Sequence, residues 1–401
     1  MATSARGWAA REGLALVPVA AALLVAGTQI PGSTLVPWQP NMMDLGVYQR
    51  VGRLVLTGGD IFDAQGQLPW IYPGFAALLT VPFAGLPFLA AAVGWLVLCT
   101  AALAAILHRL GYTGWRLSLL TTAAILLVQP VRDTLGFGQL AIFLVAAAVL
   151  DSMPGRRLWS RRLLPEGWLV GVVTAIKLTP AVVAAYNFFA GRRRPGLVAF
   201  ASFVAATAIG FLLLPAASLE YWLRLASGDS GLNSGIVFAS NQSVLGMWNR
   251  LTGAPSAGGL VLSLLVVVLG LVAAVLMHRA GEVPLALCLA GLTSLLGSPI
   301  SWSHHYVWVV PLAVVLWQAR TLPARLRWPG LGYCCWVAVA PFMWLRSGDN
   351  VELAYATWEQ LVDNLGIVAG VLLLAGSVAT ALGPWGRTRA ADAARTVAEP
   401  A

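Results

Sequence analysis

Charged side chains are scarce in this chain: they make up 10% of its 401 residues, whereas 59% of the residues are apolar. A soluble globular domain usually carries about 25% charged residues. No soluble fold of this length could bury so much apolar surface, so lipid must solvate much of it. The composition therefore predicts an all-α, polytopic transmembrane protein.

Cysteine and histidine are also rare, with four of each. Cys99 and Cys288 lie in apolar runs, Cys334 and Cys335 are adjacent, and none has zinc-ligand spacing. The sequence has no P-loop, Rossmann fingerprint, GxSxG or HExxH motif. These absences disfavour a soluble nucleotide-using enzyme, and these motifs give no sign of a cofactor.

The net charge of +9 comes from arginines in short clusters between apolar runs. Such clusters are typical of the cytoplasmic loops of membrane proteins. Nucleic acid is therefore not an expected partner, whereas membrane lipids are.

A hydrocarbon core of ~30 Å needs roughly 20 helical residues to cross it. The apolar pattern predicts ten full spans, over residues 13–31, 89–109, 116–132, 137–152, 196–215, 258–278, 283–298, 304–319, 328–345 and 364–383. The first apolar run lacks the usual small-residue cleavage site of a signal peptide before Pro31, so we interpret it as a retained span.

Two further apolar segments, 72–87 and 167–190, complete a prediction of about twelve membrane helices. All arginine clusters lie in the cytoplasm only under two conditions. Segment 72–87 must re-enter the membrane or lie on its outer surface. Segment 167–190 must be a hairpin that is broken near Lys177 to Pro180. Residues 1–385 then form one transmembrane domain with cytoplasmic termini. The Ala-rich tail, 386–401, is predicted to be disordered.

The first outer loop, 32–71, contains a predicted amphipathic helix that begins at Asp44. This helix either lies in the membrane interface or packs on the protein as an ordinary loop helix. Asp44 itself has two interpretations: its carboxylate caps the helix, or it is a general base near the membrane surface.

Two of the four histidines, His304 and His305, are adjacent at the outer start of a predicted span. They lack HxxxH or HxH spacing and a neighbouring acid, so a metal site is the weaker interpretation. Imidazole bonding to a phosphate or a sugar hydroxyl is the stronger one.

Lys177 interrupts an apolar segment at the predicted break of its hairpin. An ionisable group at membrane depth costs about 2.5–3.5 kcal/mol, so it usually marks a functional site. Anion binding is favoured over snorkelling of the ammonium group to a lipid headgroup. Further polar and aromatic candidates on the outer side are Tyr48, Tyr72, Gln139, Asn241, Gln242 and Trp302.

These residues belong to motifs that occur in a fixed order, namely Asp44-Leu-Gly-Val-Tyr48, Tyr72-Pro73, Gly138-Gln139, Lys177 with Pro180, Asn241-Gln242-Ser243, and Ser298-Pro299 through His304-His305. The ordered set resembles the actinobacterial polyprenol-phosphate-mannose-dependent alpha-1,2-mannosyltransferases, which have the GT-C membrane fold. Within that family it is most similar to the mannosyltransferases of phosphatidylinositol-mannoside synthesis. It departs at Tyr72-Pro73-Gly74, where relatives often have a second proline.

The resemblance implies an inverting transferase of the bacterial plasma membrane whose active site faces the periplasm. The donor would be polyprenol-phosphate-mannose and the acceptor a phosphatidylinositol-mannoside glycolipid, with no nucleotide sugar and no metal. The family's catalytic acid maps to Asp44, the general base. Lys177, His304 and His305 would stabilise the leaving phosphate. Sugar and acceptor would contact Tyr48, Tyr72, Gln139, Asn241, Gln242 and Trp302.

Two alternatives stay open. An arabinofuranosyltransferase of the same fold would carry similar motifs, because sugar choice depends on pocket shape. A lipid or sugar transporter would also have broken helices, but its ionisable groups would lie near the midplane and its halves would repeat. Here the ionisable groups gather at one face.

Overall fold

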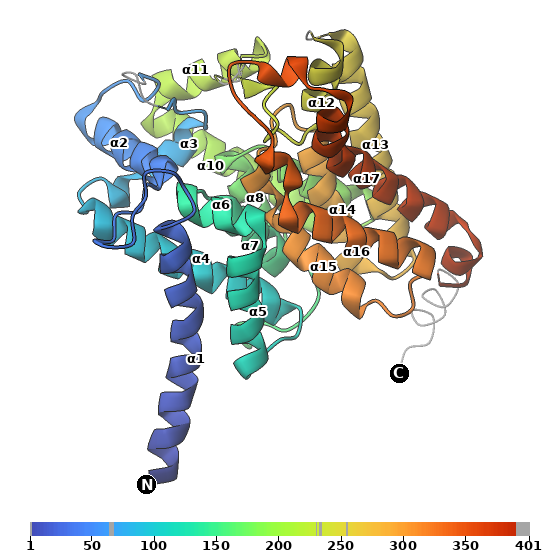
Figure 1. Cartoon of the computed structure of the whole chain (residues 1–401), viewed down its shortest axis with the longest axis horizontal. Helices are drawn as coiled ribbons and strands as arrows, with labels where there is room; N and C mark the ends of the chain where they lie inside the picture. The colour runs from blue at the N-terminus through green and yellow to red at the C-terminus, as the bar shows by residue number, and fades with distance from the viewer. Residues whose placement is uncertain (1, 64–67, 230, 232–234, 254–255, 390–401) are drawn as a thin grey trace.

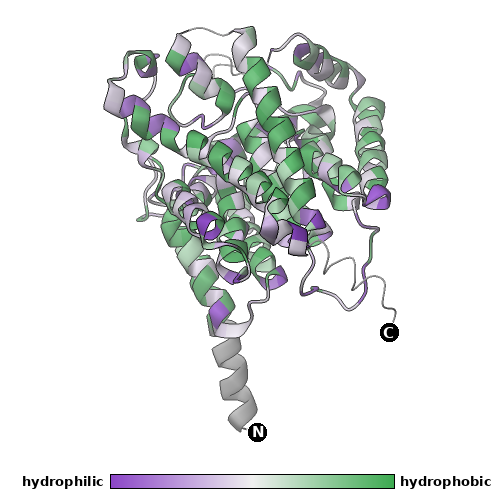
Figure 2. Ribbon diagram, turned by 90° about the vertical axis from the view of Figure 1, so that its right-hand side faces the viewer, coloured by the Kyte–Doolittle hydropathy of each residue, from purple (hydrophilic) through white to green (hydrophobic). Residues whose placement is uncertain are grey.

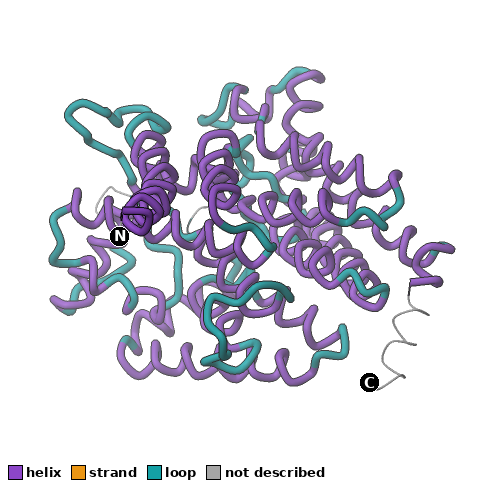
Figure 3. Tube along the Cα trace, turned by 90° about the horizontal axis from the view of Figure 1, so that it is seen from below, coloured by secondary structure: helices purple, strands orange, loops and turns teal. Residues whose placement is uncertain are grey.

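The computed structural model describes residues 2–63, 68–229, 231, 235–253 and 256–389, with side chains from Leu14 onward. Within these residues the regular structure is helical, as Figure 3 shows. The β pairing within the described residues consists of two isolated bridges, Thr34 with Gln39 and Asn241 with Trp302. The prediction of an all-α protein is confirmed.

The N-terminal half of the described chain forms α1 (Ala2–Ala26), α2 (Met43–Thr57), α3 (Gly74–Leu78), the 3-10 helix η1 (Val81–Phe83), α4 (Phe88–Arg109), α5 (Gly114–Leu127), α6 (Gln129–Phe137), α7 (Ala141–Ser152), α8 (Trp168–Ile176) and α9 (Ala181–Phe189). The C-terminal half forms α10 (Arg193–Leu213), α11 (Pro215–Ala226), α12 (Val244–Thr252), α13 (Ala257–Arg279), α14 (Val283–Leu296), η3 (Ser303–Trp308), α15 (Val309–Gln318), α16 (Ala324–Val339), η4 (Pro341–Trp344), η5 (Val351–Ala354) and α17 (Thr357–Leu382). In Figure 1, α2, α11 and α12 lie at the top of the helix bundle and the N-terminus lies at the bottom.

In the part of the chain that the structure describes, four helices, α4, α10, α13 and α17, are long and apolar enough to cross a membrane. Figure 2 shows long hydrophobic stretches along the helices of the bundle. The prediction of ten full spans is not met in the described chain, because α7, α14 and α15 have only 12, 14 and 10 residues. In α14 every residue from Leu285 to Leu296 is buried. A helix enclosed by other helices is apolar all round without crossing lipid, so hydropathy alone overcounts spans.

The predicted span 116–132 is also wrong as a single straight helix. The chain bends by 79° between α5 and α6. Val128 is extended at the break, and Pro130 lies in the first turn of α6. A proline is tolerated there because the first N–H groups of a helix have no partner within the helix. The bend turns α6 across the bundle towards η3, against which it packs.

The segment 72–87 is not a full span, since it contains only α3 and η1, both of which contact α2. The segment 167–190 forms the predicted hairpin of α8 and α9. Gly167, before α8, packs on Pro195, and Phe188, near the end of α9, packs on Gly196. Both ends of the hairpin therefore meet the start of α10, and Lys177 lies at its tip.

The first-loop helix is confirmed: α2 buries Leu45, Tyr48 and Val51 on one face. It packs against the protein through α3, η1 and α6, which agrees with the packed loop helix. At the other terminus, residues 384–389 are helical, so the described part of the predicted disordered tail, 386–389, is helical instead. Arg389 pairs there with Glu282, and residues 390–401 lie outside the described residues.

Candidate active site

A cavity of about 570 Å³ opens beside the start of α2, where Asp44 lies. Its walls come from the loop before α3, the junction of α6 and α7, the tip of the α8–α9 hairpin, the loop before α12, and η3. The lining residues include Asp44, Tyr48, Tyr72, Gln139, Lys177, Trp302, His304 and His305. Eight of the predicted site residues, distant in sequence, therefore face one space.

Asp44 is half-buried in the first turn of α2. The N-cap residue of this helix is Met42, and no side chain caps the helix, so the capping interpretation of Asp44 is wrong. Burial raises the pKa of Asp44 to about 6, while a hydrogen bond from Gln139 and the charge of Lys177 act in the opposite direction. A carboxylate with such a pKa is a better proton acceptor near neutral pH than an ordinary aspartate.

A glycine brings Gln139 beside Asp44. Gly138 has a φ of 74°, and a Cβ at this position would lie 2.8 Å from the Cβ of Leu45. Only glycine allows both the left-handed conformation and this close approach. The start of α2 consequently packs directly on the turn between α6 and α7.

Gln139 links the carboxylate to an aromatic wall. Its Oε1 accepts hydrogen bonds from the hydroxyl groups of Tyr48, at 3.3 Å, and Tyr72, at 3.5 Å. The side-chain nitrogen is then left to donate to Asp44. Tyr48 and Tyr72 pack edge-on against Trp70, so three aromatic rings support one another beside Gln139.

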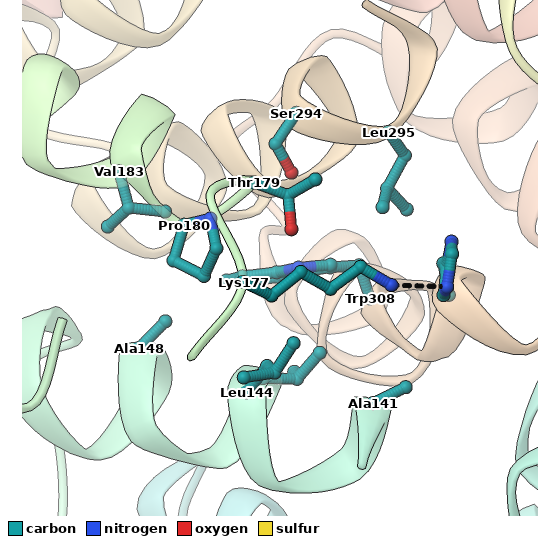
Figure 4. A pocket seen from close by; sticks show the side chains of 12 residues that line it. Ala141, Leu144, Ala148, Lys177, Thr179, Pro180, Val183, Ser294, Leu295 and Trp308 are labelled. Atoms are coloured by element: carbon teal, nitrogen blue, oxygen red, sulfur yellow. Dashed lines mark hydrogen bonds between the residues drawn. The ribbon is translucent and has the colours of Figure 1, made fainter. Parts of the chain in front are cut away.

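The tip of the hairpin places the only lysine of the chain in the same cavity. Nζ of Lys177 lies 2.6 Å from Nε2 of His305 and 5.7 Å from the ring centroid of Tyr72. Figure 4 shows the extended Lys177 side chain crossing the smaller pocket, with Thr179 on one side and the apolar side chains Leu144 and Ala148 on the other. An apolar floor of this kind keeps the ammonium group away from bulk water.

The second nitrogen of His305 fixes the tautomer of its ring. The backbone N–H of Trp302 donates to Nδ1 of His305, so the proton of the neutral ring lies on Nε2. This N–H faces Nζ of Lys177. Nζ of Lys177, 2.6 Å away, accepts this hydrogen bond as the neutral amine, so the two groups form one hydrogen-bonded pair in the cavity wall.

His304 adds a third polar group. Its ring centroid lies 4.5 Å from that of His305. Its Nε2 is buried and has no hydrogen-bond partner among the described residues, although the residue lines the cavity. A buried nitrogen without a partner in a cavity wall is available to a substrate.

The histidine pair is anchored by a buried carboxylate that the sequence did not single out as a site residue. Oγ of Ser303 donates to Asp133 at 2.6 Å, and Gln29 and Gln129 also donate to this carboxylate. The backbone oxygen of His304 accepts from Thr134. The signal in the sequence was an ionisable residue, Asp133, within an apolar stretch.

Asn241 and Gln242 do not line this cavity. Asn241 accepts from the Ser301 N–H at 2.8 Å and donates to the Ile236 oxygen, and Gln242 donates to the side chain of Asp363 at 3.0 Å. We expected these two residues to contact sugar hydroxyls directly. The arrangement does not support such contacts, because the side-chain amides of both residues already form hydrogen bonds with protein groups. They hold the loop before α12 against η3.

A metal centre finds no support in the part of the chain that the structure describes: no three His, Cys, Asp or Glu side chains gather there as a ligand group. The His304 and His305 pair has Lys177 as its nearest ionisable partner. An amine beside the rings favours anions over cations.

Residues 70–299 match the model of glycosyltransferase family 87. The chain is 31% identical over 380 residues to the polyprenol-phosphate-mannose-dependent alpha-(1-2)-phosphatidylinositol mannoside mannosyltransferase of Mycobacterium tuberculosis strain H37Rv, covering 85% of this chain and 86% of that protein. It is 28% identical over 418 residues to the protein of the same description from Mycolicibacterium smegmatis, covering 93% and 91%.

The description of a third relative names a different acceptor, a phosphatidylinositol pentamannoside. The polyprenol-phosphate-mannose-dependent alpha-(1-2)-phosphatidylinositol pentamannoside mannosyltransferase of Mycobacterium tuberculosis strain CDC 1551 is 32% identical over 383 residues, which cover 88% of this chain and 86% of that protein. No solved structure matches the chain.

Proposed function

The chain belongs to glycosyltransferase family 87, and from this premise we propose that it transfers mannose from polyprenol-phosphate-mannose to a phosphatidylinositol-mannoside glycolipid. The descriptions of the relatives name this donor and this class of acceptor. The observation that carries the proposal is the single cavity in which Asp44 faces Lys177 and His305. It combines a proton acceptor with a site for a phosphate leaving group.

In the proposed reaction Asp44 is the general base. It takes the proton of an acceptor hydroxyl while that oxygen forms a bond to the anomeric carbon of mannose. The bond from this carbon to the phosphate oxygen breaks on the opposite face, and the phosphate leaves with the bonding electrons. Displacement from the opposite face inverts a beta-linked donor to an alpha product, here an alpha-1,2 linkage.

Lys177 and the two histidines stabilise the departing phosphate in this proposal. Lys177 supplies a positive charge when it is protonated, and the His305 ring lies beside it at 2.6 Å. His304 offers a buried nitrogen without a partner among the described residues. Donors that are already in place need not reorganise as charge develops on the leaving oxygen, which is why they lower the barrier.

The sugar and the acceptor are oriented by the remaining cavity residues. Tyr48, Tyr72 and Trp302 present aromatic surface to a pyranose ring, and Gln139 keeps the Asp44 carboxylate in position. Asn241 and Gln242 contribute by holding the loop and η3 rather than by touching the sugar.

The proposal also places this cavity on the periplasmic side of the plasma membrane. The polyprenyl chain of the donor would stay in the bilayer while its mannose reaches Asp44. The arginine clusters of the loops support this orientation, because positively charged loops remain in the cytoplasm.

The test is a transferase assay with Asp44→Asn. Asparagine keeps the shape of the side chain but cannot take a proton, so we expect kcat to fall by roughly 10²–10⁴-fold. Membranes containing each variant receive polyprenol-phosphate-mannose and a phosphatidylinositol mannoside, and mass spectrometry detects the addition of one hexose.

Asp349→Asn is the matched control, since Asp349 is an exposed loop carboxylate that does not line the cavity. Equal product from wild type and Asp44→Asn would overturn the role of Asp44. A wild-type protein that uses polyprenol-phosphate-arabinofuranose and rejects the mannose donor would overturn the choice of sugar.

A further inference from the structure

A second cavity, of about 380 Å³, shares no lining residue with the Asp44 cavity. It lies between the end of α4, the end of α7 and the loop before α8. Helix α7 begins two residues after Gln139 and ends at Ser152, next to Asp151 in the second cavity. Twelve helical residues span about 17 Å, so the two cavities lie near opposite ends of this helix.

The charge of the second cavity is strongly positive. Four arginines line it, Arg109, Arg157, Arg161 and Arg162, against one carboxylate, Asp151. Asp151 is already paired with Arg162. Among the described residues, Arg157 and Arg161 form no ion pair. The cavity therefore attracts an anion, and two guanidinium groups remain to bind it.

The same loop is apolar as well as basic. The sequence Arg-Arg-Leu-Trp at 156–159 is followed by Arg-Arg-Leu-Leu at 161–164. The apolar members are exposed, with 65% of Trp159 and 75% of Leu163 accessible, and both line the cavity. Exposed tryptophan and leucine beside arginines are typical of a segment in the membrane interface.

These observations favour an amphipathic anion as the ligand. A free phosphate ion would be satisfied by the arginines and would gain nothing from Trp159 and Leu163. A phospholipid has both parts, since its phosphate suits the guanidinium groups and its acyl chains suit the apolar side chains. Basic pockets beside transmembrane helices bind anionic headgroups by this combination.

We infer that this cavity binds the headgroup of an anionic phospholipid from the leaflet opposite the Asp44 cavity. Arg157 and Arg161 hold the phosphate, and Leu158, Trp159 and Leu163 contact the acyl chains. The site takes no part in the proposed transferase chemistry, so its test does not depend on whether the proposed function is correct.

The experiment is native mass spectrometry of the delipidated full-length protein in neutral detergent, titrated with phosphatidylglycerol or phosphatidylcholine. Wild type is expected to prefer phosphatidylglycerol by about tenfold or more. Each arginine near an anionic lipid contributes roughly a factor of five in binding. The double variant Arg157→Gln/Arg161→Gln is therefore expected to bind phosphatidylglycerol about 30-fold more weakly.

Arg193→Gln/Arg194→Gln is the matched control, because it removes the same charge from two exposed arginines outside the cavity. Its affinity for phosphatidylglycerol should stay close to that of wild type. Equal weakening in both double variants would mean diffuse surface attraction and would overturn the site. So would the absence of a preference for phosphatidylglycerol in wild type.

A competition arm separates a lipid from a free phosphate. Inorganic phosphate and glycerophosphoglycerol, which lack acyl chains, should not displace phosphatidylglycerol at millimolar concentration. Displacement by either would make the cavity a general phosphate site and contradict the lipid assignment. Thermal unfolding of each variant in the same detergent confirms that it is folded.

Discussion

Asp44 illustrates how a single residue acquires its chemistry from its surroundings. On the helix it occupies a first-turn position, where a negative charge is favourable. Within the fold it is half-buried, and burial outweighs both the hydrogen bond of Gln139 and the charge of Lys177. The net result is a carboxylate that is ionised at neutral pH yet basic enough to take a proton.

This balance predicts the pH dependence of the transferase. The base must be ionised, and the pKa of Asp44 is raised from 3.8 to about 6. Lowering the pH through 6 protonates it, so kcat/KM should fall about tenfold per pH unit below that point. The measurement is a pH profile of kcat/KM for mannose transfer. An inflection near pH 4 would show instead that the catalytic carboxylate is fully solvated.

At the scale of helices, one buried ion pair joins α12 to α17. Nε of Arg250 lies 2.6 Å from Oδ2 of Asp363, and both side chains are inaccessible to solvent. Arg250 also donates to the backbone oxygen of Asn241, and Gln242 donates to Asp363. The pair thus holds the loop before α12, which packs on η3, the element that carries His304 and His305.

Removing one partner of this pair should be costly. Arg250→Met leaves the Asp363 carboxylate buried without its counter-ion, which costs about 3–5 kcal/mol in comparable pairs. The double variant Arg250→Met/Asp363→Leu removes both charges and should recover most of this stability. Denaturant unfolding in detergent measures the difference. A neutral single variant, or a double variant less stable than the single one, would contradict the importance of the pair.

At the scale of the whole molecule, the two cavities lie near opposite ends of α7 and differ in their lining. The Asp44 cavity collects an acid, an amine and two imidazoles. The second cavity collects arginines and exposed apolar side chains. An asymmetric distribution of arginine is the feature that orients membrane proteins, so the two ends should face different compartments.

Cysteine labelling tests this orientation. In a Cys335→Ser background, which removes the one exposed native thiol of the described residues, Leu68→Cys places a thiol at the Asp44 cavity and Arg156→Cys places one in the arginine-rich loop. A membrane-impermeant maleimide should label position 68 in intact spheroplasts. Position 156 should be labelled only after permeabilisation. The reverse pattern would place the active site in the cytoplasm.

Local sequence patterns determined the helical class, the amphipathic face of α2 and the hairpin broken at Lys177. Each of these depends on neighbours within a few turns of helix, where apolar periodicity and proline act directly. The residues that resemble a known family also identified eight residues of the cavity lining, from Asp44 to His305. The number of full spans could not be read in this way, because a helix buried in protein and one buried in lipid have the same composition.

Only the tertiary structure decided which polar residues face the cavity. In the folded chain, Asn241 and Gln242 hold a loop in place instead of facing the cavity. Asp133 accepts a hydrogen bond from Ser303 of η3, and Lys177 contacts His305. Positions 177 and 305 meet because the hairpin tip and η3 pack together, and positions 250 and 363 meet because α12 packs on α17. Such contacts arise from the packing of distant helices, which the local period of a sequence does not encode.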